Sequence, residues 1–250
     1  MTGEAAASSR VRASLASAGR LERRPPGWAR QAWLVAKKDL LIELATGEIV
    51  TTAGFFAVLV AIIASLAFFA GQKSEIEVAP GVIWVSVAFS SVLALSRTWQ
   101  REREDGALRG LLVSPLSRSA IFAGKALGVA AFMTAVELVV VLVTAVLFNI
   151  RLSQDGAILA LLLLAATPGV AASGTLFGAM TIRTRARDLV LASVMLPLLA
   201  PSLLAGVTAT RELLGGASLV ELRDYFVLLG LFGLVFVVGG LGLFETVLEG

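Results

Sequence analysis

Long stretches without a charged side chain are the feature that most constrains this sequence. Five stretches lack Asp, Glu, Lys and Arg altogether, and a sixth, from Ile121 to Phe148, is interrupted only by Lys125 and Glu137. A membrane-spanning helix needs about 20 such residues. The runs are apolar on all sides, whereas a helix of a soluble domain carries one apolar stripe. The uncharged stretches cover residues 49–72, 78–96, 156–182, 189–210 and 225–244.

The pattern predicts an all-α integral membrane protein with six transmembrane helices in a domain that covers residues 49–250. Composition agrees, because only 16% of the residues are charged, against about 25% in soluble domains. We expect the spans at about 49–71, 78–96, 121–148, 156–181, 189–210 and 225–247.

The positions of Lys and Arg predict the orientation. Sixteen of them lie before the first span or in the loops that follow spans 2 and 4, and four lie in the other three loops, with Lys125 inside span 3. Because positive loops stay in the cytoplasm, we expect both termini there, in a bacterial cytoplasmic (inner) membrane.

The chain before the first span falls into two parts. Residues 1–27 are rich in Ala, Ser and Arg, which predicts a disordered cytoplasmic tail, although an organelle transit peptide has a similar composition. Residues 28–48 place Trp33, Leu40 and Leu44 at helical spacing, with charged residues on other faces. This pattern favours an amphipathic helix in the membrane interface over a cytoplasmic extension of span 1.

The loop between spans 2 and 3 combines charges with a short apolar pattern. Leu108, Leu111 and Leu112 recur at helical spacing after the turn signal Asp105–Gly106. The sequence Ser114–Pro115 ends this pattern, because the residue before a proline avoids helical geometry. A short rigid helix here could fit a groove of a cytoplasmic partner. A charge-balanced loop on the membrane surface explains the residues equally well.

Several residues inside the spans are open to a functional or a structural interpretation. A charged Glu137 is costly at mid-membrane depth. It therefore either lines a translocation path or couples movement to protonation, or it is protonated and bonded to a neighbouring Thr or backbone carbonyl. Pro197 and Pro201 either mark a hinge or an opening near a substrate path or form a static kink. Trp84 is either an aromatic anchor at the interface or part of a haem-facing or partner-facing surface. Lys125 is expected to reach the inner interface with its flexible side chain.

Close helix packing is predicted where small residues recur. Gly174 and Gly178 form a GxxxG pattern in span 4. Packing within the chain is the default interpretation, and a dimer seam is the alternative.

The loop motif and the start of span 2 resemble known permeases. An Asp-Gly-x-Leu-x-x-Leu stretch followed by Ser-Pro, in six spans, is similar to ABC-2-type exporter permeases. The sequence Ala79-Pro80-Gly81-Val82-Ile83-Trp84, with Arg97 after span 2 and the pair Pro197 and Pro201, resembles the CcmB family of cytochrome c maturation. The resemblance runs from about residue 30 to the C-terminus.

The resemblance implies a permease subunit that works with a separate ATPase (CcmA-like), haem-handling subunits (CcmC-like and the small CcmD-like) and a haem chaperone (CcmE-like). ATP would act through the partner, and haem is the possible substrate. A dimer of permeases is expected. The implied ATPase-coupling residues are Arg101, Glu104, Asp105, Gly106, Leu108, Leu111, Leu112, Ser114 and Pro115. The implied translocation path or partner surface contains Pro80, Gly81, Trp84, Glu137, Pro197 and Pro201.

Missing residue types limit the chemistry of the chain. It contains no His and no Cys, so imidazole or thiolate metal sites, haem ligation by His and Ser-His-Asp triads are excluded. Gly124–Lys125 is the nearest approach to a P-loop, but Ser119 and Ala126 stand where the first glycine and the hydroxyl are required. We therefore predict no catalytic, metal or cofactor site in this chain. A permease for another amphiphile and an ATP-independent secondary transporter are the alternatives.

Overall fold

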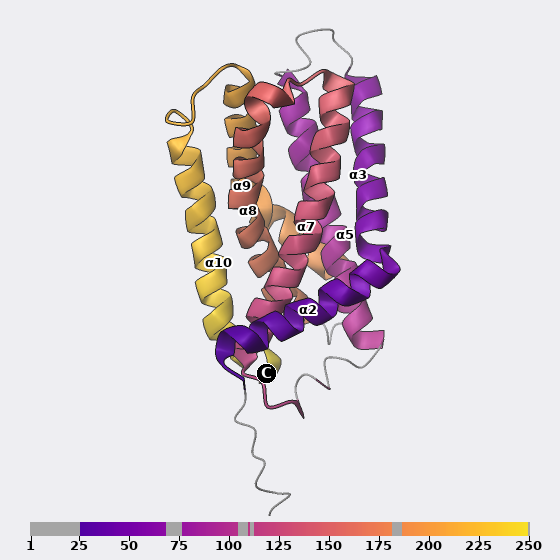
Figure 1. Ribbon diagram of the computed structural model, residues 1–250, viewed down its shortest axis with the longest axis vertical. Coiled ribbons are helices and arrows are strands. Elements are labelled where there is room, and N and C mark those ends of the chain that lie inside the picture. The colour runs from indigo at the N-terminus through magenta and orange to yellow at the C-terminus, as the bar shows by residue number, and fades with distance from the viewer. Residues whose placement is uncertain (1–25, 69–76, 105–109, 111–112, 182–186, 250) are drawn as a thin grey trace, which may run out of the picture.

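The computed structural model describes residues 26–68, 77–104, 110, 113–181 and 187–249 (Figure 1). Seven long helices make up most of these residues, and within the described ranges there is no strand. The helices are α2 (Trp28–Thr46), α3 (Glu48–Ala67), α5 (Ala79–Glu104), α7 (Arg118–Phe148), α8 (Leu152–Thr181), α9 (Arg187–Leu214) and α10 (Arg223–Glu249).

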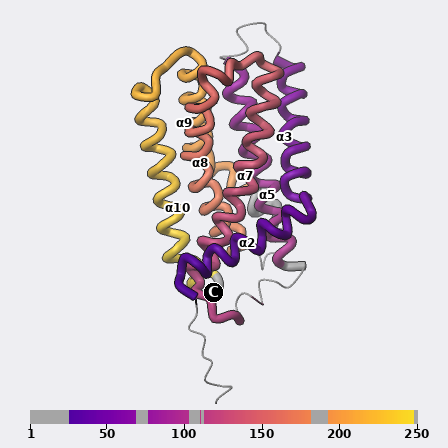
Figure 2. Tube along the Cα trace, in the orientation of Figure 1, coloured from indigo at the N-terminus to yellow at the C-terminus, as the bar shows by residue number. Residues whose placement is uncertain are grey.

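Six of the helices stand side by side as an upright bundle, and α2 crosses the bundle obliquely at its lower end (Figures 1 and 2). The helices α7 and α8 form the centre, since α7 packs on α2, α3, α5 and α8, while α8 packs on α9 and α10. The chain enters the bundle through α2 and leaves it from α10 at the same lower end.

All six upright helices are long and apolar enough to span a membrane, which confirms the predicted all-α membrane fold. Several bounds differ from the predicted ones by up to four residues, and one differs by more. The first span, α3, ends at Ala67, before the predicted limit of 71, and α5 continues past the predicted limit of 96 to Glu104. The charged residues Arg97, Arg101 and Glu102 therefore lie on α5 itself, beyond its apolar part. The inside–outside orientation remains a prediction.

The helix α2 buries the small apolar residues Ala32, Val35 and Ala36 but turns its largest apolar side chains away from the protein. Trp33, Leu41 and Leu44 are 56%, 55% and 83% exposed, while the polar residues Asp39 and Glu43 are buried. This inverted arrangement suits a helix on a membrane surface, because lipid covers its outer face. Gly47 ends the helix in the left-handed conformation, at φ 63°, and α3 begins at the next residue.

The GxxxG pattern of α8 packs inside the chain. The Cα atoms of Gly174 and Gly178 face Leu95 and Trp99 of α5 so closely that a Cβ atom at either glycine would overlap those side chains. The prediction of close packing within the chain is confirmed. Both glycines are buried, so a dimer seam along this face is wrong.

Candidate functional site

Four charged side chains meet where α2 crosses the lower end of the bundle. Lys38 and Asp39 come from α2, Glu102 from α5 and Lys125 from α7, and we call them the inner charge cluster. The Lys125 Nζ atom lies 2.8 Å from the Asp39 Oδ2 atom and also bonds to the Glu102 Oε1 atom. The Lys38 Nζ atom lies 2.7 Å from the same Glu102 oxygen and 3.1 Å from the Asp39 Oδ1 atom. The cluster thus links three helices that are far apart in the sequence.

Three of the four side chains are almost fully enclosed, and that of Lys38 is 34% exposed. The Lys125 side chain is 1% exposed, and those of Glu102 and Asp39 are 7% and 8% exposed. Buried charges are stable only when they are paired, and two cations here balance two carboxylates. Burial acts to lower the pKa of Lys38, but Asp39 and Glu102 outweigh this effect and raise its pKa above the usual value. Lys38 is therefore charged.

One oxygen of the cluster is left over. The Glu102 Oε2 atom is buried and has no hydrogen-bond partner among the described residues. The cluster borders a cavity of about 30 Å³, which Arg101 and Thr98 also line. A cavity of about 10–15 Å³ already holds a water molecule, and buried acceptors are rarely unpaired. The cavity therefore has room for water that could donate to this oxygen.

A second set of ion pairs fixes the corner between α2 and α3. Arg101 of α5 lies 3.2 Å from the Glu43 Oε2 atom and 3.2 Å from the Glu48 Oε2 atom. The Glu43 Oε1 atom also accepts a hydrogen bond from the Val50 N–H at 2.8 Å. This contact satisfies one of the free N–H groups at the start of α3. Arg101 and Glu102 are neighbours, so one turn of α5 holds both α2 and the corner.

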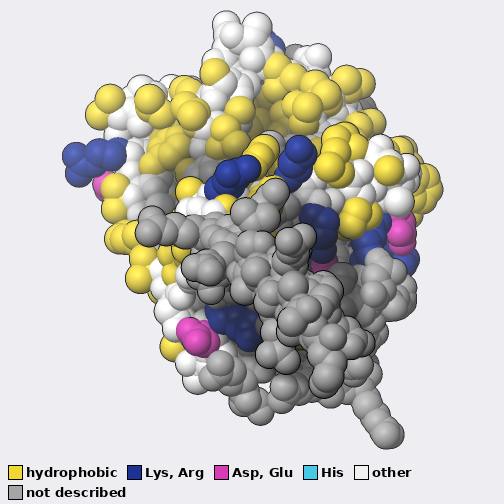
Figure 3. Space-filling view, turned by 60° about the horizontal axis from the view of Figure 1, so that its bottom comes forward, with side chains coloured by type: hydrophobic (Ala, Val, Ile, Leu, Met, Phe, Trp, Pro, Cys, Tyr) yellow, Lys and Arg dark blue, Asp and Glu magenta, His cyan; other side chains and the backbone are white. Residues whose placement is uncertain are grey.

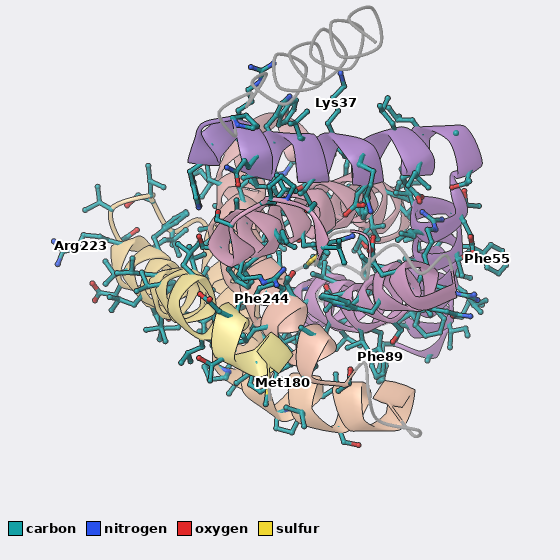
Figure 4. All side chains as sticks on the ribbon, turned by 90° about the horizontal axis from the view of Figure 1, so that it is seen from below. Lys37, Phe55, Phe89, Met180, Arg223 and Phe244 are labelled. Atoms are coloured by element: carbon teal, nitrogen blue, oxygen red, sulfur yellow. The ribbon has the colours of Figure 1, made fainter. Side chains whose placement is uncertain are left out.

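The other end of α2 is bonded to the start of α7. The Ser117 N–H donates to the Gln31 Oε1 atom at 2.8 Å, and the Trp28 Nε1–H donates to the Ser119 Oγ atom at 3.0 Å. Between these bonds and the cluster, Gly124 of α7 lies against the Ala32 carbonyl oxygen so closely that a Cβ atom there would overlap it. Seen from below, α2 runs along one side of the bundle, with Lys37 pointing away from it (Figure 4).

The prediction for Lys125 is wrong. Its side chain does not extend to the inner interface, because two carboxylates inside the protein, Asp39 and Glu102, already pair with it. Local patterns could not show this pairing, since Asp39 lies 86 positions away. The available signal was the presence of opposite charges near the inner ends of three neighbouring helices.

The predicted ATPase-coupling residues are only partly described. Arg101 lies on α5 in the ion pairs above, and Glu104 is the last residue of that helix. Ser114 donates its N–H to the Gly110 carbonyl oxygen at 3.1 Å, and Pro115 is exposed. The predicted residues Asp105, Gly106, Leu108, Leu111 and Leu112 lie outside the described residues. The prediction of a coupling helix stays a prediction.

Glu137 is buried in the bundle beside Thr167 of α8. The Thr167 hydroxyl lies 2.9 Å and 3.0 Å from the two carboxyl oxygens, and 2.8 Å from the Leu163 carbonyl oxygen. A hydroxyl has one proton to donate. A protonated carboxyl could donate to Thr167 while Thr167 donates to Leu163, whereas a carboxylate would compete with that carbonyl. The geometry favours the neutral form and the predicted bond to a neighbouring Thr.

Glu137 also borders a groove on the outside of the bundle. The groove has a volume of about 250 Å³ and runs between the upper halves of α7 and α8. Its walls are apolar except for Glu137 and Thr134. Leu138 and Leu164, at 61% and 50% exposure, form its rim. The groove therefore opens toward the surroundings of the bundle, where lipid would lie.

Trp84 lies in the core of the bundle. It is 1% exposed, its Nε1–H donates to the Thr210 Oγ1 atom of α9 at 2.9 Å, and its ring packs against Gly206. Neither an interface anchor nor a partner-facing surface fits this position. The physical reason is the hydroxyl partner in α9, which satisfies the indole N–H away from water. Pro80 is buried near Trp84 in the first turn of α5, and Gly81 is partly exposed.

Pro197 and Pro201 occupy the outer face of α9. Both are exposed, and the helix continues through them from Arg187 to Leu214. Neither proline lines the groove that Glu137 borders. A further proline, Pro168 of α8, also lies inside a helix and was not among the residues predicted from the sequence.

The lower face of the molecule carries basic side chains next to apolar ones (Figure 3). Among the described residues there is no group of three or more acidic side chains that could hold a metal ion. The charged side chains of the inner charge cluster form ion pairs between α2, α5 and α7.

The sequence is similar to one family of known proteins. The family described as CcmB protein matches residues 30–244. Heme exporter protein B of Bradyrhizobium diazoefficiens is 28% identical over 183 residues, which are 72% of this chain and 81% of that protein. Heme exporter protein B of Pseudomonas aeruginosa is 27% identical over 188 residues, or 73% and 81%. The protein of that name from Paracoccus denitrificans is 34% identical over 144 residues, or 56% and 64%.

Proposed function

Because this chain belongs to the CcmB protein family, we propose that it is the membrane permease subunit of a haem-export system that serves cytochrome c maturation. The observation that carries the proposal is the family match over residues 30–244, which includes the interfacial helix and nearly all of the six spans. The relatives are named heme exporter protein B. A chain made of six spans and short connections suits the role of a transport subunit.

The energy source is a separate ATPase. A P-loop needs a glycine-rich turn whose backbone amides and Lys hold phosphate. Gly124 lies inside α7 against α2, and Lys125 is buried in the inner charge cluster. Neither residue is available to a nucleotide. ATP hydrolysis is thus assigned to a CcmA-like partner, and two copies of the permease would serve two ATPase subunits.

The ATPase meets the lower end of the bundle through residues 101–115. The charge distribution supports a cytoplasmic location of this end, and so do the exposed residues Arg30 and Lys37 on the outer face of α2, beside Trp33 and Leu41. Basic and apolar side chains on one face suit the anionic cytoplasmic surface of a bacterial inner membrane.

Haem handling is shared with other subunits. The chain contains no His and no Cys, so it does not supply the usual axial ligands of haem iron. A CcmC-like and a CcmD-like membrane subunit and a CcmE-like chaperone are the proposed partners for that task. The permease converts ATP-driven closure of the ATPase into rearrangement of its spans, which leads to release of the haem-loaded chaperone.

Paired substitutions in the loop test the ATPase contact. Leu108→Glu with Leu111→Glu places two charges on the proposed contact face, so co-purification of the ATPase should fall at least tenfold, while the amount of permease in the membrane stays within about twofold. The matched control is Leu219→Glu with Val220→Glu, at exposed positions of the opposite end, which should retain the ATPase. Full retention of the ATPase by the loop variant would contradict the assignment.

A further inference from the structure

The interfacial helix α2 is bonded to the chain on both sides of the proposed ATPase contact. Before that segment, Lys38 pairs with Glu102 at 2.7 Å, two residues before α5 ends. After the segment, Gln31 and Trp28 bond to Ser117 and Ser119 at the start of α7. The residues at the two ends of this segment, Glu102 and Ser117, are therefore both bonded to α2.

The two connections differ in kind. The helix α2 packs along α7 but makes almost no backbone approach to α5. The link between α2 and α5 consists of long charged side chains, namely Lys38 with Glu102, and Arg101 with Glu43. Packed helices move together, whereas a link made of flexible charged side chains can change its pairing while the backbones shift.

The pairing within the inner charge cluster leaves room for such a change. Two lysines, Lys38 and Lys125, share the Oε1 atom of Glu102, while no side chain or backbone group of the described residues bonds to its Oε2 atom. The cluster also borders a cavity of about 30 Å³. Either lysine could transfer to the second oxygen without breaking the charge balance. The stability of the fold does not require this arrangement, because replacing a buried ion pair by apolar residues of similar volume often leaves the free energy of unfolding unchanged.

We propose that the inner charge cluster is the joint that transmits movement of the lower end of α5 to α2 and, across the corner at Gly47, to the first span α3. The inference rests on the proposed function, since it assumes that the ATPase acts through residues 101–115. Lys38, Asp39, Glu102 and Lys125 are positioning residues, and none of them is assigned a contact with haem or ATP. Arg101 supports the same route, because it holds Glu43 and Glu48 on the two sides of Gly47.

The test removes the joint but keeps its volume. Lys125→Met with Glu102→Gln leaves two neutral side chains of similar size, and Lys38 can still pair with Asp39. The permease is purified with its ATPase from membranes of a strain that lacks its own copy. We expect the amount of permease and of bound ATPase within about twofold of wild type, and the c-type cytochrome formed per unit of ATPase activity reduced at least tenfold.

A matched control and a second variant separate the possible outcomes. Arg97→Gln removes an exposed ion pair of the same helix, with Glu48 at 3.6 Å, and should keep the wild-type ratio. Lys38→Met removes one contact of Glu102 from a side chain that is 34% exposed, so it should fold even if the double variant does not, and should lower the ratio at least threefold. A wild-type ratio in Lys38→Met or in a folded double variant would overturn the inference.

A distance measurement supplies a readout that a purely structural role would leave unchanged. The chain has no Cys, so spin labels can be placed at Leu34→Cys on α2 and Met180→Cys at the lower end of α8, both exposed. Adding ATP should change this distance in the wild-type complex but not in the double variant. An equal change in both complexes would contradict the joint. If the wild-type chain binds no ATPase, the proposed function itself fails, which is a separate result.

Discussion

Individual buried polar residues have partners that lie far away in the sequence. Trp84 bonds to Thr210 across 126 positions, and Lys125 pairs with Asp39 across 86. Patterns within one span predicted that these residues lie in or near the membrane. They could not predict the partner, because that depends on which helices pack together. The membrane interface was therefore predicted for Lys125 and was one of the two alternatives for Trp84, because unpaired residues of these types usually lie there.

Glu137 was better predicted, because its cost at mid-membrane depth limits the possibilities. The structure places Thr167 beside it, as one of the two interpretations required. Glu137→Gln keeps a neutral group that can donate to Thr167, so cytochrome c yield should stay within about twofold of wild type. Glu137→Lys brings a charge to this buried position, which costs about 2.5–3.5 kcal/mol or more, and should lower the amount of folded protein several-fold.

Haem staining of c-type cytochromes, normalised to permease in the membrane, measures both variants. A severe loss of cytochrome in Glu137→Gln, with normal protein amounts, would show that an ionisable proton is needed at this position. The neutral, structural role would then be wrong.

At the scale of elements, the helices themselves could be predicted and their mutual packing could not. The break at Gly47 has a local cause, since glycine often ends helices in the left-handed conformation. Which face of α2 lies against the bundle was hidden, because its buried face carries the polar residues Gln31, Asp39 and Glu43 beside small apolar ones. That face is buried because these polar residues have partners at the lower ends of α5 and α7.

Two glycine substitutions test the corner between α2 and α3. Gly47→Ala forces an alanine into the left-handed region, at φ 63°, which costs about 1–2 kcal/mol. Gly54→Ala lies inside α3 with no neighbouring atom within 4 Å of the added methyl group, and should gain up to about 1 kcal/mol in helix propensity. The measurement is size-exclusion chromatography in detergent after heating, which gives the temperature at which half of the protein is lost from its monodisperse peak. This temperature should fall for Gly47→Ala and should not fall for Gly54→Ala. Equal shifts would contradict the strained corner.

At the scale of the whole molecule, the number of spans was predictable because each span is a local signal of about 20 apolar residues. Each of the six apolar stretches can be recognised without knowing which helices it packs against, and all six are helices long enough to span a membrane. The bounds were less predictable. The helix α5 extends to Glu104 because ion pairs with α2 and α3 hold its charged last turns.

Labelling of introduced cysteines tests the predicted orientation, because the natural chain has none. Ser153 lies at the upper end of the bundle, at the start of α8, and Ala45 lies at the lower end, near the end of α2, and both are exposed. A maleimide that cannot cross membranes should label Ser153→Cys in whole cells with an opened outer membrane, and Ala45→Cys only after the inner membrane is permeabilised. The reverse pattern would invert the orientation and remove the ATPase contact from the cytoplasm.

The central claim is that this chain is a permease subunit of cytochrome c maturation, and deletion of its gene tests that claim most directly. The measurement is haem staining of membrane c-type cytochromes, with b-type cytochromes of the same membranes as the internal reference. The account predicts loss of covalently bound haem from all c-type cytochromes, unchanged b-type haem, and recovery when the wild-type chain is supplied again. Normal c-type cytochromes in the deletion strain would contradict the account and favour export of another amphiphile.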